Sequence, residues 1–151
     1  MPTKTTPAPT ALAAELQQQL VDLVALGLVA KQAHWNVVGP QFRALHLQLD
    51  EIAAEYLTWQ DEVAERATAL GAFPDVRPAV LLEQQSVKPI PAGRLKDADV
   101  ARLLVERLDG VIAATRTRVD VVADDLATQD IVIQVLQGLE KQRWMLRAQL
   151  A

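Results

Sequence analysis

The segment GAFPDVRPAVLLEQQSVKPIPAGRLK, residues 71–96, decides the fold that this chain of 151 residues can adopt. It contains four prolines and two glycines, and it is too long to be an ordinary turn between neighbouring helices. We therefore expect it to cross from one end of a helical bundle to the other. Residues 79–85 predict a short helix within this crossover.

Apolar residues recur with the helical period on both sides of the crossover, in four amphipathic stretches. The stretches are residues 10–37, 40–70, 97–126 and 128–150. Gly39-Pro40 ends the first helix and opens the second, Asp97 or Asp99 is expected to cap the third, and Thr128 to start the fourth. Four long helices with one long crossover predict an all-α, ferritin-like four-helix bundle, because a cytokine bundle has two long crossovers.

The composition agrees with one helical domain over residues 10–151, preceded by a short flexible tail at residues 1–9, which are polar and proline-rich. Half of the residues are apolar but only 4% are aromatic, so the core must consist of Leu, Val, Ile and Ala. The chain has no cysteine, which excludes disulfides, thiolate metal sites and cysteine nucleophiles.

The same features favour a cytoplasmic protein that does not enter a membrane. The absence of cysteine fits a reducing compartment. Residues 1–9 lack the basic stretch and apolar run of a signal peptide. Asp22 and Lys31 interrupt the longest apolar runs, which are expected to be too short for a membrane span.

The chain has two histidines, His34 and His46. His46 and Asp50 are four residues apart, as are Asp61 and Glu65, so each pair shares one face of the second helix. The eleven residues from Asp50 to Asp61 are close to three helical turns, and both pairs therefore point the same way. Imidazole and carboxylate groups can bind non-haem iron, zinc or manganese. A set of solvated helix charges has the same spacing and remains the alternative.

One copy of the second helix cannot bring these four side chains to one metal ion. Eleven residues separate the two pairs by roughly 16 Å along the helix, whereas ligand atoms lie about 2 Å from a metal. Two antiparallel copies, related by a two-fold axis, place His46 and Asp50 of one chain opposite Asp61 and Glu65 of the other. His34, near the end of the first helix, can join them.

Other ferritin-like bundles hold their metal ions inside one subunit, on Glu-x-x-His motifs. Lys31 and Arg43 stand three residues before the two histidines, where that motif requires glutamate. The sequence therefore excludes a di-iron site of this type.

Residues 31–40, KQAHWNVVGP, with Phe42, Leu45-His46 and Leu49-Asp50-Glu51, resemble the signature of the Dps family, the mini-ferritins known as DNA-binding proteins from starved cells. The resemblance covers roughly residues 12–150, and it continues in three further segments. These are residues 61–66 (DEVAER), Ala69-Leu70-Gly71, and Leu139-Glu140-Lys141 with Trp144.

The resemblance implies a ferroxidase that stores iron. It implies that His34, His46 and Asp50 of one subunit, with Asp61 and Glu65 of its two-fold mate, are both the iron ligands and the catalytic residues. It also implies a hollow dodecamer built from two-fold dimers, which oxidises Fe²⁺ with hydrogen peroxide in preference to oxygen. The ferric mineral stays inside, and the consumption of peroxide protects DNA from oxidative damage.

The resemblance further implies roles for Trp35 and for a group of aspartates, and the sequence itself suggests roles for two other tryptophans and three glutamates. Trp35 adjoins the iron site, where it is either a sacrificial electron donor or an anchor of the subunit interface. Trp59 and Trp144 are expected to pack against other side chains. Aspartates where the third helix passes to the fourth are expected to line a pore at a three-fold axis, and three glutamates to face the cavity and nucleate mineral. The aspartates are Asp120, Asp124, Asp125 and Asp130, with Asp125 and Asp130 as the best candidates, and the glutamates are Glu51, Glu55 and Glu62.

DNA binding is expected to be weak or absent. The net charge is −4 per chain, so a shell of twelve chains carries about −48 and repels phosphate. Residues 1–9 contain one lysine, Lys4, and the basic residues Lys141, Arg143 and Arg147 are interleaved with core positions. Two alternatives remain open: an architectural protein that compacts DNA, and a structural helical oligomer whose metal site is vestigial or holds zinc.

Overall fold

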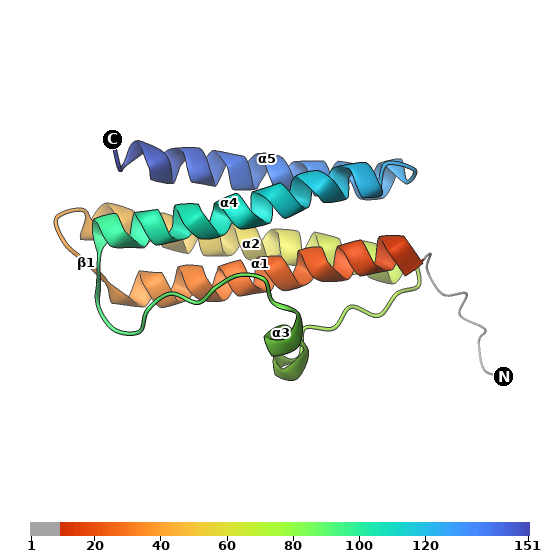
Figure 1. Ribbon diagram of the computed structural model, residues 1–151, viewed down its shortest axis with the longest axis horizontal. Helices are drawn as coiled ribbons and strands as arrows, with labels where there is room; N and C mark the ends of the chain where they lie inside the picture. The colour runs from red at the N-terminus through yellow and green to blue at the C-terminus, as the bar shows by residue number, and fades with distance from the viewer. Residues whose placement is uncertain (1–9) are drawn as a thin grey trace.

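Four long helices lie side by side in the computed structural model, which describes residues 10–151 (Figure 1). A short helix lies in the crossover, and two strands of two residues each pair near one end of the bundle. The elements in chain order are α1 (Thr10–Asn36), β1 (Val37–Val38), α2 (Phe42–Ala69), α3 (Pro78–Gln84), β2 (Leu95–Lys96), α4 (Asp97–Val121) and α5 (Leu126–Ala148). The predicted bundle with one long crossover is confirmed; the tail predicted at residues 1–9 lies outside the described residues.

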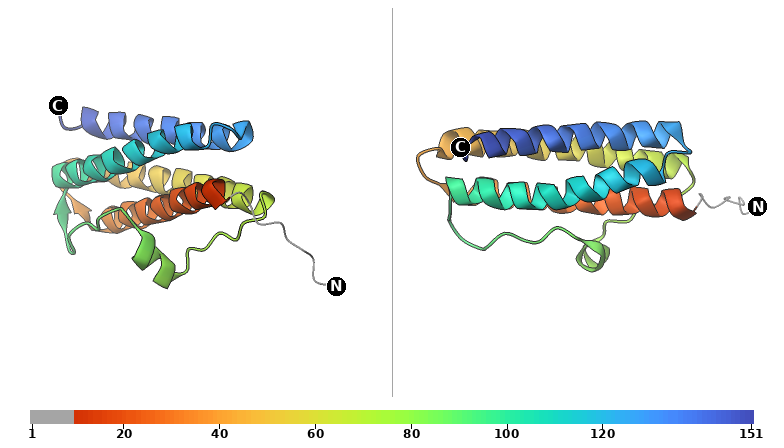
Figure 2. Two further views of the ribbon diagram at one scale, coloured as in Figure 1. Left: turned by 45° about the vertical axis from the view of Figure 1, so that its right-hand side comes forward. Right: turned by 45° about the horizontal axis from the view of Figure 1, so that its top comes forward.

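The bundle is built from two antiparallel pairs, α1 with α2 and α4 with α5 (Figure 2). The turn between α1 and α2 is short because Gly39 adopts a φ of +130°, a conformation that residues with a side chain rarely tolerate. The segment between α2 and α4 runs along the outside of the bundle from one end to the other, so that α4 runs parallel to α2. This topology leaves one side of the α1–α2 pair without a covering helix.

Aliphatic side chains fill the space between the four helices, as the composition predicts. The largest fully buried apolar residues include Leu16 and Leu23 of α1, Leu49 and Tyr56 of α2, and Leu139 of α5. The predicted helix boundaries at the α4–α5 connection are wrong by a few residues. Helix α4 ends at Val121 instead of near residue 126, and α5 begins at Leu126, two residues before Thr128, because the side chain of Asp125 caps it by accepting a hydrogen bond from the Thr128 N–H.

Helix α1 is more apolar than we expected from the interruptions at Asp22 and Lys31. Residues Ala11–Asn36 reach a mean hydropathy of 1.3 over 18 residues and, by length and composition, are sufficient to cross a membrane. In the folded chain half of that window is buried, since α1 packs against α2 and α4. Leu28 is nevertheless 58% exposed. The outer side of α1 is therefore apolar as well.

A polar cluster lies inside the bundle between α1 and α4. The guanidinium of Arg118 donates hydrogen bonds to Asp22 at 2.7 Å and to Gln19 at 3.0 Å. Thr115 also donates to Gln19, and Ser86 of the crossover donates to Asp22. Because a buried charge needs a partner, this cluster fixes α1, α4 and the crossover relative to one another.

Trp59 of α2 packs against α5 at Gly138, as its predicted packing role requires. A methyl group on Gly138 would stand 2.1 Å from Cζ2 of Trp59, far inside van der Waals contact. The ring also contacts Tyr56, with ring centroids 5.9 Å apart. Glycine at this position therefore lets a tryptophan fill the space between α2 and α5.

We expect Gly138→Ala to destabilise the chain even though alanine is the better helix former. Overpacking costs about 1–3 kcal/mol, more than the roughly 1 kcal/mol that alanine gains over glycine within a helix. Gly110→Ala in α4 is the matched control, because its methyl group meets nothing within 4 Å, and it should leave the protein equally or more stable. Chemical unfolding followed by tryptophan fluorescence compares the two variants; a stabilised Gly138→Ala protein would contradict the packing argument.

Candidate metal centre

The two histidines stack on each other where α1 ends and α2 begins. Their ring centroids are 3.8 Å apart with an interplanar angle of 16°. Nδ1 of His34 lies 2.8 Å from the backbone carbonyl of His46, and Nδ1 of His46 lies 2.9 Å from the carbonyl of His34. Phe42 covers the pair on one side, with its ring centroid 5.0 Å from that of His46.

This reciprocal arrangement indicates which nitrogen of each ring donates a hydrogen bond. A backbone carbonyl can only accept, so both Nδ1 atoms must donate. In a neutral imidazole the proton on Nδ1 leaves the lone pair of Nε2 free. A hydrogen bond from the far nitrogen to a carbonyl is the usual support of a metal-bound histidine, because it fixes the orientation of the ring and makes it a stronger ligand. In the neutral form of each ring, Nε2 therefore carries the lone pair that a metal ligand needs.

Asp50 lies one helical turn after His46 and is held by Lys31 of α1. The Lys31 ammonium is 2.6 Å from a carboxylate oxygen of Asp50. This hydrogen bond and the positive charge hold the pKa of the Asp50 carboxyl below its usual value, so the group is ionised at neutral pH. His34, His46 and Asp50 thus share one region of the α1–α2 pair. A metal that binds Asp50 must compete with Lys31.

Asp61 and Glu65 lie farther along α2, and both are exposed. Among residues 10–151, no three histidine, aspartate or glutamate side chains converge on one point that could hold a metal ion. One chain therefore brings His34 and His46 into contact, with Asp50 one helical turn away and paired with Lys31, and it leaves Asp61 and Glu65 farther along α2. Their meeting across a two-fold axis remains a prediction.

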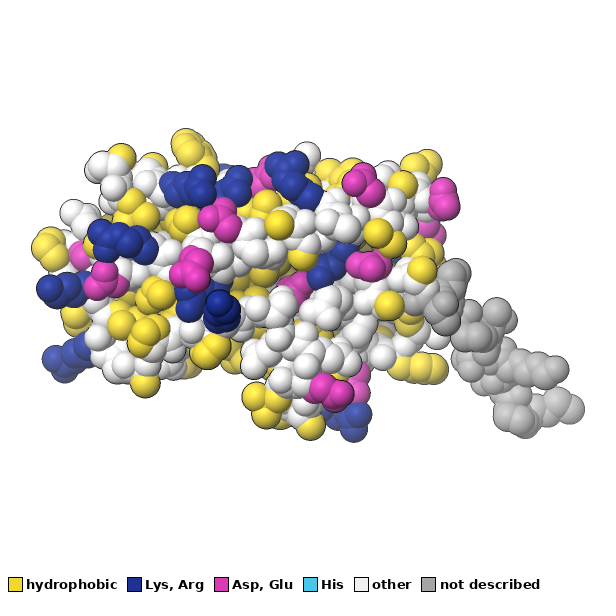
Figure 3. All heavy atoms as spheres, viewed as in Figure 1, with side chains coloured by type: hydrophobic (Ala, Val, Ile, Leu, Met, Phe, Trp, Pro, Cys, Tyr) yellow, Lys and Arg dark blue, Asp and Glu magenta, His cyan; other side chains and the backbone are white. Residues whose placement is uncertain are grey.

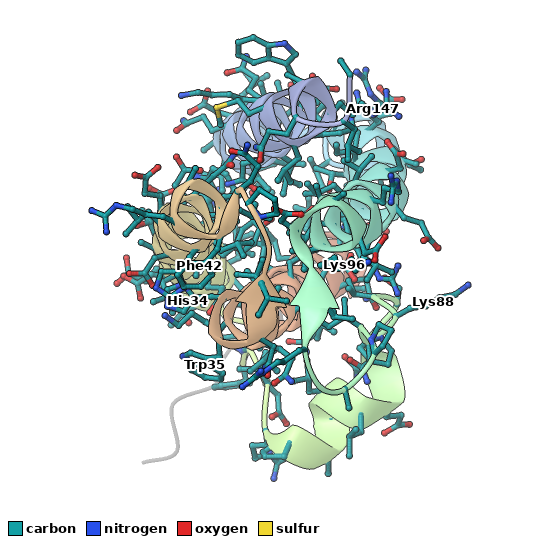
Figure 4. The ribbon with its side chains drawn as sticks, turned by 90° about the vertical axis from the view of Figure 1, so that its left-hand side faces the viewer. His34, Trp35, Phe42, Lys88, Lys96 and Arg147 are labelled. Carbon is teal, nitrogen blue, oxygen red and sulfur yellow. The ribbon has the colours of Figure 1, made fainter. Side chains whose placement is uncertain are left out.

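An apolar groove runs between α1 and α2 from Lys31 and Asp50 towards Gln60, with a volume of about 340 Å³. Its walls include Leu28 and Leu57, which are 58% and 66% exposed. These two leucines and the groove form one stretch of exposed apolar surface. Figure 4 shows that His34, Trp35 and Phe42 lie on the outer side of the α1–α2 pair, away from α4.

Trp35 stands at this surface with 68% of its area exposed. The Lys31 ammonium lies 5.7 Å from the centroid of its ring, within reach of a cation–π contact. The position is compatible with both predicted roles of Trp35, electron donor and interface anchor.

The aspartates predicted to line a pore differ in whether their carboxylates are already paired within the chain. Asp125 caps α5 and accepts two hydrogen bonds from Arg66, at 2.9 and 3.1 Å. Hydrogen bonds from Thr128 and Arg66 hold the pKa of Asp125 below its usual value. This carboxylate is already paired within its own chain. Its place in a pore stays a prediction. Asp120, Asp124 and Asp130 are exposed, and Figure 3 shows acidic side chains gathered at the end where α4 passes to α5.

Two other expectations concern side chains on the surface. Trp144 of α5 is 66% exposed, so the prediction that it packs within the chain is wrong. Trp144 lies on the outer side of α5. The helical period alone does not show which face of a helix is covered by another element, and this explains the error. Glu51, Glu55 and Glu62 are all exposed on α2, and Glu55 accepts a hydrogen bond from the buried Gln142. Their role in mineral nucleation stays a prediction.

The sequence did not reveal that Lys31 forms a salt bridge with the carboxylate of Asp50. One signal was present: Lys31 precedes His34 by three residues, which places both on the same face of α1. The pairing itself joins residues that are 19 positions apart, and it depends on how α1 and α2 are aligned.

Residues 13–151 match the ferritin-like domain family, so the chain is a ferritin-like protein. It is 35% identical over 140 residues to the "DNA protection during starvation protein" of Mycolicibacterium smegmatis, covering 89% of this chain and 74% of that protein. It is 36% identical to the "Fine tangled pili major subunit" of Haemophilus ducreyi, covering 92% of this chain and 74% of that protein. The crystal structure of a C-terminal deletion mutant of Mycobacterium smegmatis Dps matches with a TM-score of 0.88 at 34% identity, covering 92% of this chain and 97% of that one.

These relatives, together with the bundle, place the chain in the Dps family of ferritin-like proteins. The resemblance seen in residues 31–40 and 61–66 is thereby confirmed at the level of the family.

Proposed function

We propose that this protein is a ferroxidase that stores iron, and that its sites form between two copies of the chain. The observation that carries the proposal is the stacked pair of His34 and His46, whose Nδ1 atoms lie at hydrogen-bond distance from backbone carbonyls, next to the carboxylate of Asp50. Two imidazoles and a carboxylate suit Fe²⁺ but do not surround it. A second copy, docked on the apolar groove, supplies Asp61 and Glu65.

In this proposal Fe²⁺ is the substrate. Two Fe²⁺ ions lose one electron each, and hydrogen peroxide takes up both electrons and two protons to give two molecules of water. No hydroxyl radical is released when both electrons arrive together, which is how the reaction protects DNA. The ferric product is retained in a hollow dodecamer built from two-fold dimers, and the exposed carboxylates on α2 are the groups proposed to nucleate it.

Rapid mixing tests the proposal directly. Protein loaded with Fe²⁺ without oxygen is mixed with hydrogen peroxide or with oxygenated buffer, and the absorbance of Fe³⁺ is followed. We expect oxidation to be faster with peroxide than with oxygen and faster than without protein, and we expect the iron to co-elute with a dodecamer in gel filtration. Iron oxidation at the same rate with and without protein would overturn the proposal. Zinc binding without iron oxidation would favour a structural oligomer.

Replacing Lys31 by alanine should strengthen metal binding. In the wild-type protein the metal must displace the Lys31 ammonium from Asp50, and this competitor is removed in the variant. Exposed ion pairs contribute little, so the gain in affinity is at most about fivefold. Titration with Co²⁺, which is not oxidised under these conditions, measures it. Lys141→Ala removes the same charge from an exposed position on α5 and should bind as the wild type does; weaker binding by Lys31→Ala would contradict the competition.

DNA compaction is the second candidate function, because relatives of this chain are named for DNA protection. Lys88, Lys96 and Arg147 lie on the side of the bundle away from His34 (Figure 4). A net charge of −4 per chain opposes binding to phosphate, and we propose that DNA binding is weak or absent. A gel-shift assay at low and at physiological salt tests this, and tight complexes at physiological salt would establish the second candidate.

A further inference from the structure

The turn that joins the two histidine-bearing helices is fastened to the start of α4. Residues 37 and 38 form β1, which pairs in parallel with β2 so that Val37 lies opposite Leu95 and Val38 opposite Lys96. Val37 is buried, and β2 leads directly into α4. A contact between distant parts of the sequence thus holds the segment between His34 and His46.

Asp97, the first residue of α4, provides the closest of these contacts. One oxygen of its carboxylate accepts a hydrogen bond from the backbone N–H of Gln41 at 2.6 Å, and the other accepts from Ala98 at 2.8 Å. The carboxylate also lies against Gly39, where a Cβ atom would be 2.7 Å from Cγ and from one oxygen of Asp97. Only glycine leaves room for this approach, and only glycine readily adopts the φ of +130° found there.

Through Gln41, Asp97 acts on the N-terminus of α2. Gln41 is the N-cap residue of α2, and its own side chain makes no capping hydrogen bond. The first N–H groups of a helix lack partners within the helix, and here the carboxylate from α4 serves one of them. His46 is five residues farther along the same helix. A shift or fraying of the first turn of α2 would therefore displace His46 from His34.

We propose that Asp97 is a positioning residue for the metal centre, which acts by fixing the turn between α1 and α2 and hence the stacking of His34 on His46. The inference rests on the proposed function, because the two histidines are its metal ligands. The stacked pair depends on two hydrogen bonds of 2.8 and 2.9 Å that run in both directions between the helices. Both bonds can form together only in one alignment of α1 and α2. Asp97 holds the two helices in that alignment.

The experiment compares Asp97→Ala and Asp97→Asn with the wild-type oligomer by Co²⁺ titration and by crystal structures. Loss of groups that orient metal ligands typically weakens metal binding about 10- to 100-fold, and we expect a loss in this range for Asp97→Ala. Asp97→Asn retains one oxygen that can accept from Gln41, so it should recover part of the affinity. Asp99→Ala is the matched control, since Asp99 lies in the same helical turn and pairs only with the exposed Arg102 among residues 10–151.

The core variant Leu139→Ala tests whether Asp97→Ala loses affinity only because the protein is less stable. The loss of thermal stability is compared between the two variants. We expect Leu139→Ala to bind Co²⁺ as the wild type does. The inference is overturned if the rings remain stacked and the Co²⁺ affinity is unchanged in both Asp97 variants, or if Leu139→Ala loses as much affinity. Failure of the proposed function looks different: the wild type and His46→Ala would then bind Co²⁺ equally, while Asp97→Ala would still separate the rings in the crystal. If Asp97→Ala does not fold, Asp97→Asn carries the test.

Discussion

Mixing two inactive variants, His46→Ala and Asp61→Ala, is expected to restore about a quarter of the wild-type rate of Fe²⁺ oxidation, because an isologous dimer contains two equivalent sites. Each variant alone lacks one ligand in every site. Changes to groups that merely orient ligands cost about 10- to 100-fold in activity, so loss of a ligand should cost at least about 100-fold. The two variants together can assemble what neither can assemble alone.

The expected recovery follows from the distribution of ligands between two chains. In a mixed dimer, one site combines His34, His46 and Asp50 of the Asp61→Ala chain with Asp61 and Glu65 of the His46→Ala chain, and it is intact. The other site lacks both ligands. Random pairing makes half of the dimers mixed, and one of their two sites works, which gives about one quarter. Co-refolding or co-expression, followed by rapid mixing with hydrogen peroxide, measures the rate.

The matched control pairs two variants from the same half of the site, His46→Ala and Asp50→Ala. In their mixed dimers every site still lacks one ligand, so no activity should return. Recovery in this control, or its absence from the His46→Ala and Asp61→Ala mixture, would show that the ligands are not shared between chains as proposed. Gel filtration confirms that each mixture has formed the same oligomer.

Replacing Arg118 by alanine is expected to lower the stability of the protein much more than replacing the exposed Arg116. Arg118 and Asp22 are buried, with side-chain exposures of 6% and 0%. Removing one partner of a buried ion pair typically costs about 3–5 kcal/mol, because the remaining charge is left uncompensated. Asp22 would retain hydrogen bonds from Ser86 and Gln18 but no buried positive charge. Thermal unfolding at fixed protein concentration measures the loss, since the stability of an oligomer depends on concentration.

Two variants make this prediction specific to the buried charge. Arg116→Ala, on the same helix, breaks an exposed ion pair with Glu140 and should cost less than about 1 kcal/mol. The double variant Asp22→Leu/Arg118→Met removes both charges and replaces them with apolar groups. It should be more stable than Arg118→Ala, because replacing a buried pair by apolar residues is often neutral. A double variant that is less stable than Arg118→Ala would show that packing and not charge explains the loss.

Much of the fold could be predicted from the sequence because helices are local structures. The apolar period around Leu16, Leu49, Leu108 and Leu139 indicates which residues enter the core, and the prolines and glycines of residues 71–96 identify the crossover. The first residue of α5 was harder to predict, because Asp125 and Thr128 are both good capping residues. In the structure Asp125 caps α5 and accepts a hydrogen bond from the Thr128 N–H. The exposed Trp144 shows a second limit, because a tryptophan on a helix predicts burial only if another element covers it.

The sequence alone determined the helical content, the single crossover and the spacing of His46, Asp50, Asp61 and Glu65 along one helix, because each depends on the period and pitch of a helix. Only the tertiary structure decided how α1 lies against α2. That arrangement produces the stacking of His34 on His46 and the salt bridge between Lys31 and Asp50. The hydrogen bond from Gln41 to Asp97 also required the structure, since it joins residues 56 positions apart. Such contacts depend on the relative placement of packed helices, which no local pattern encodes.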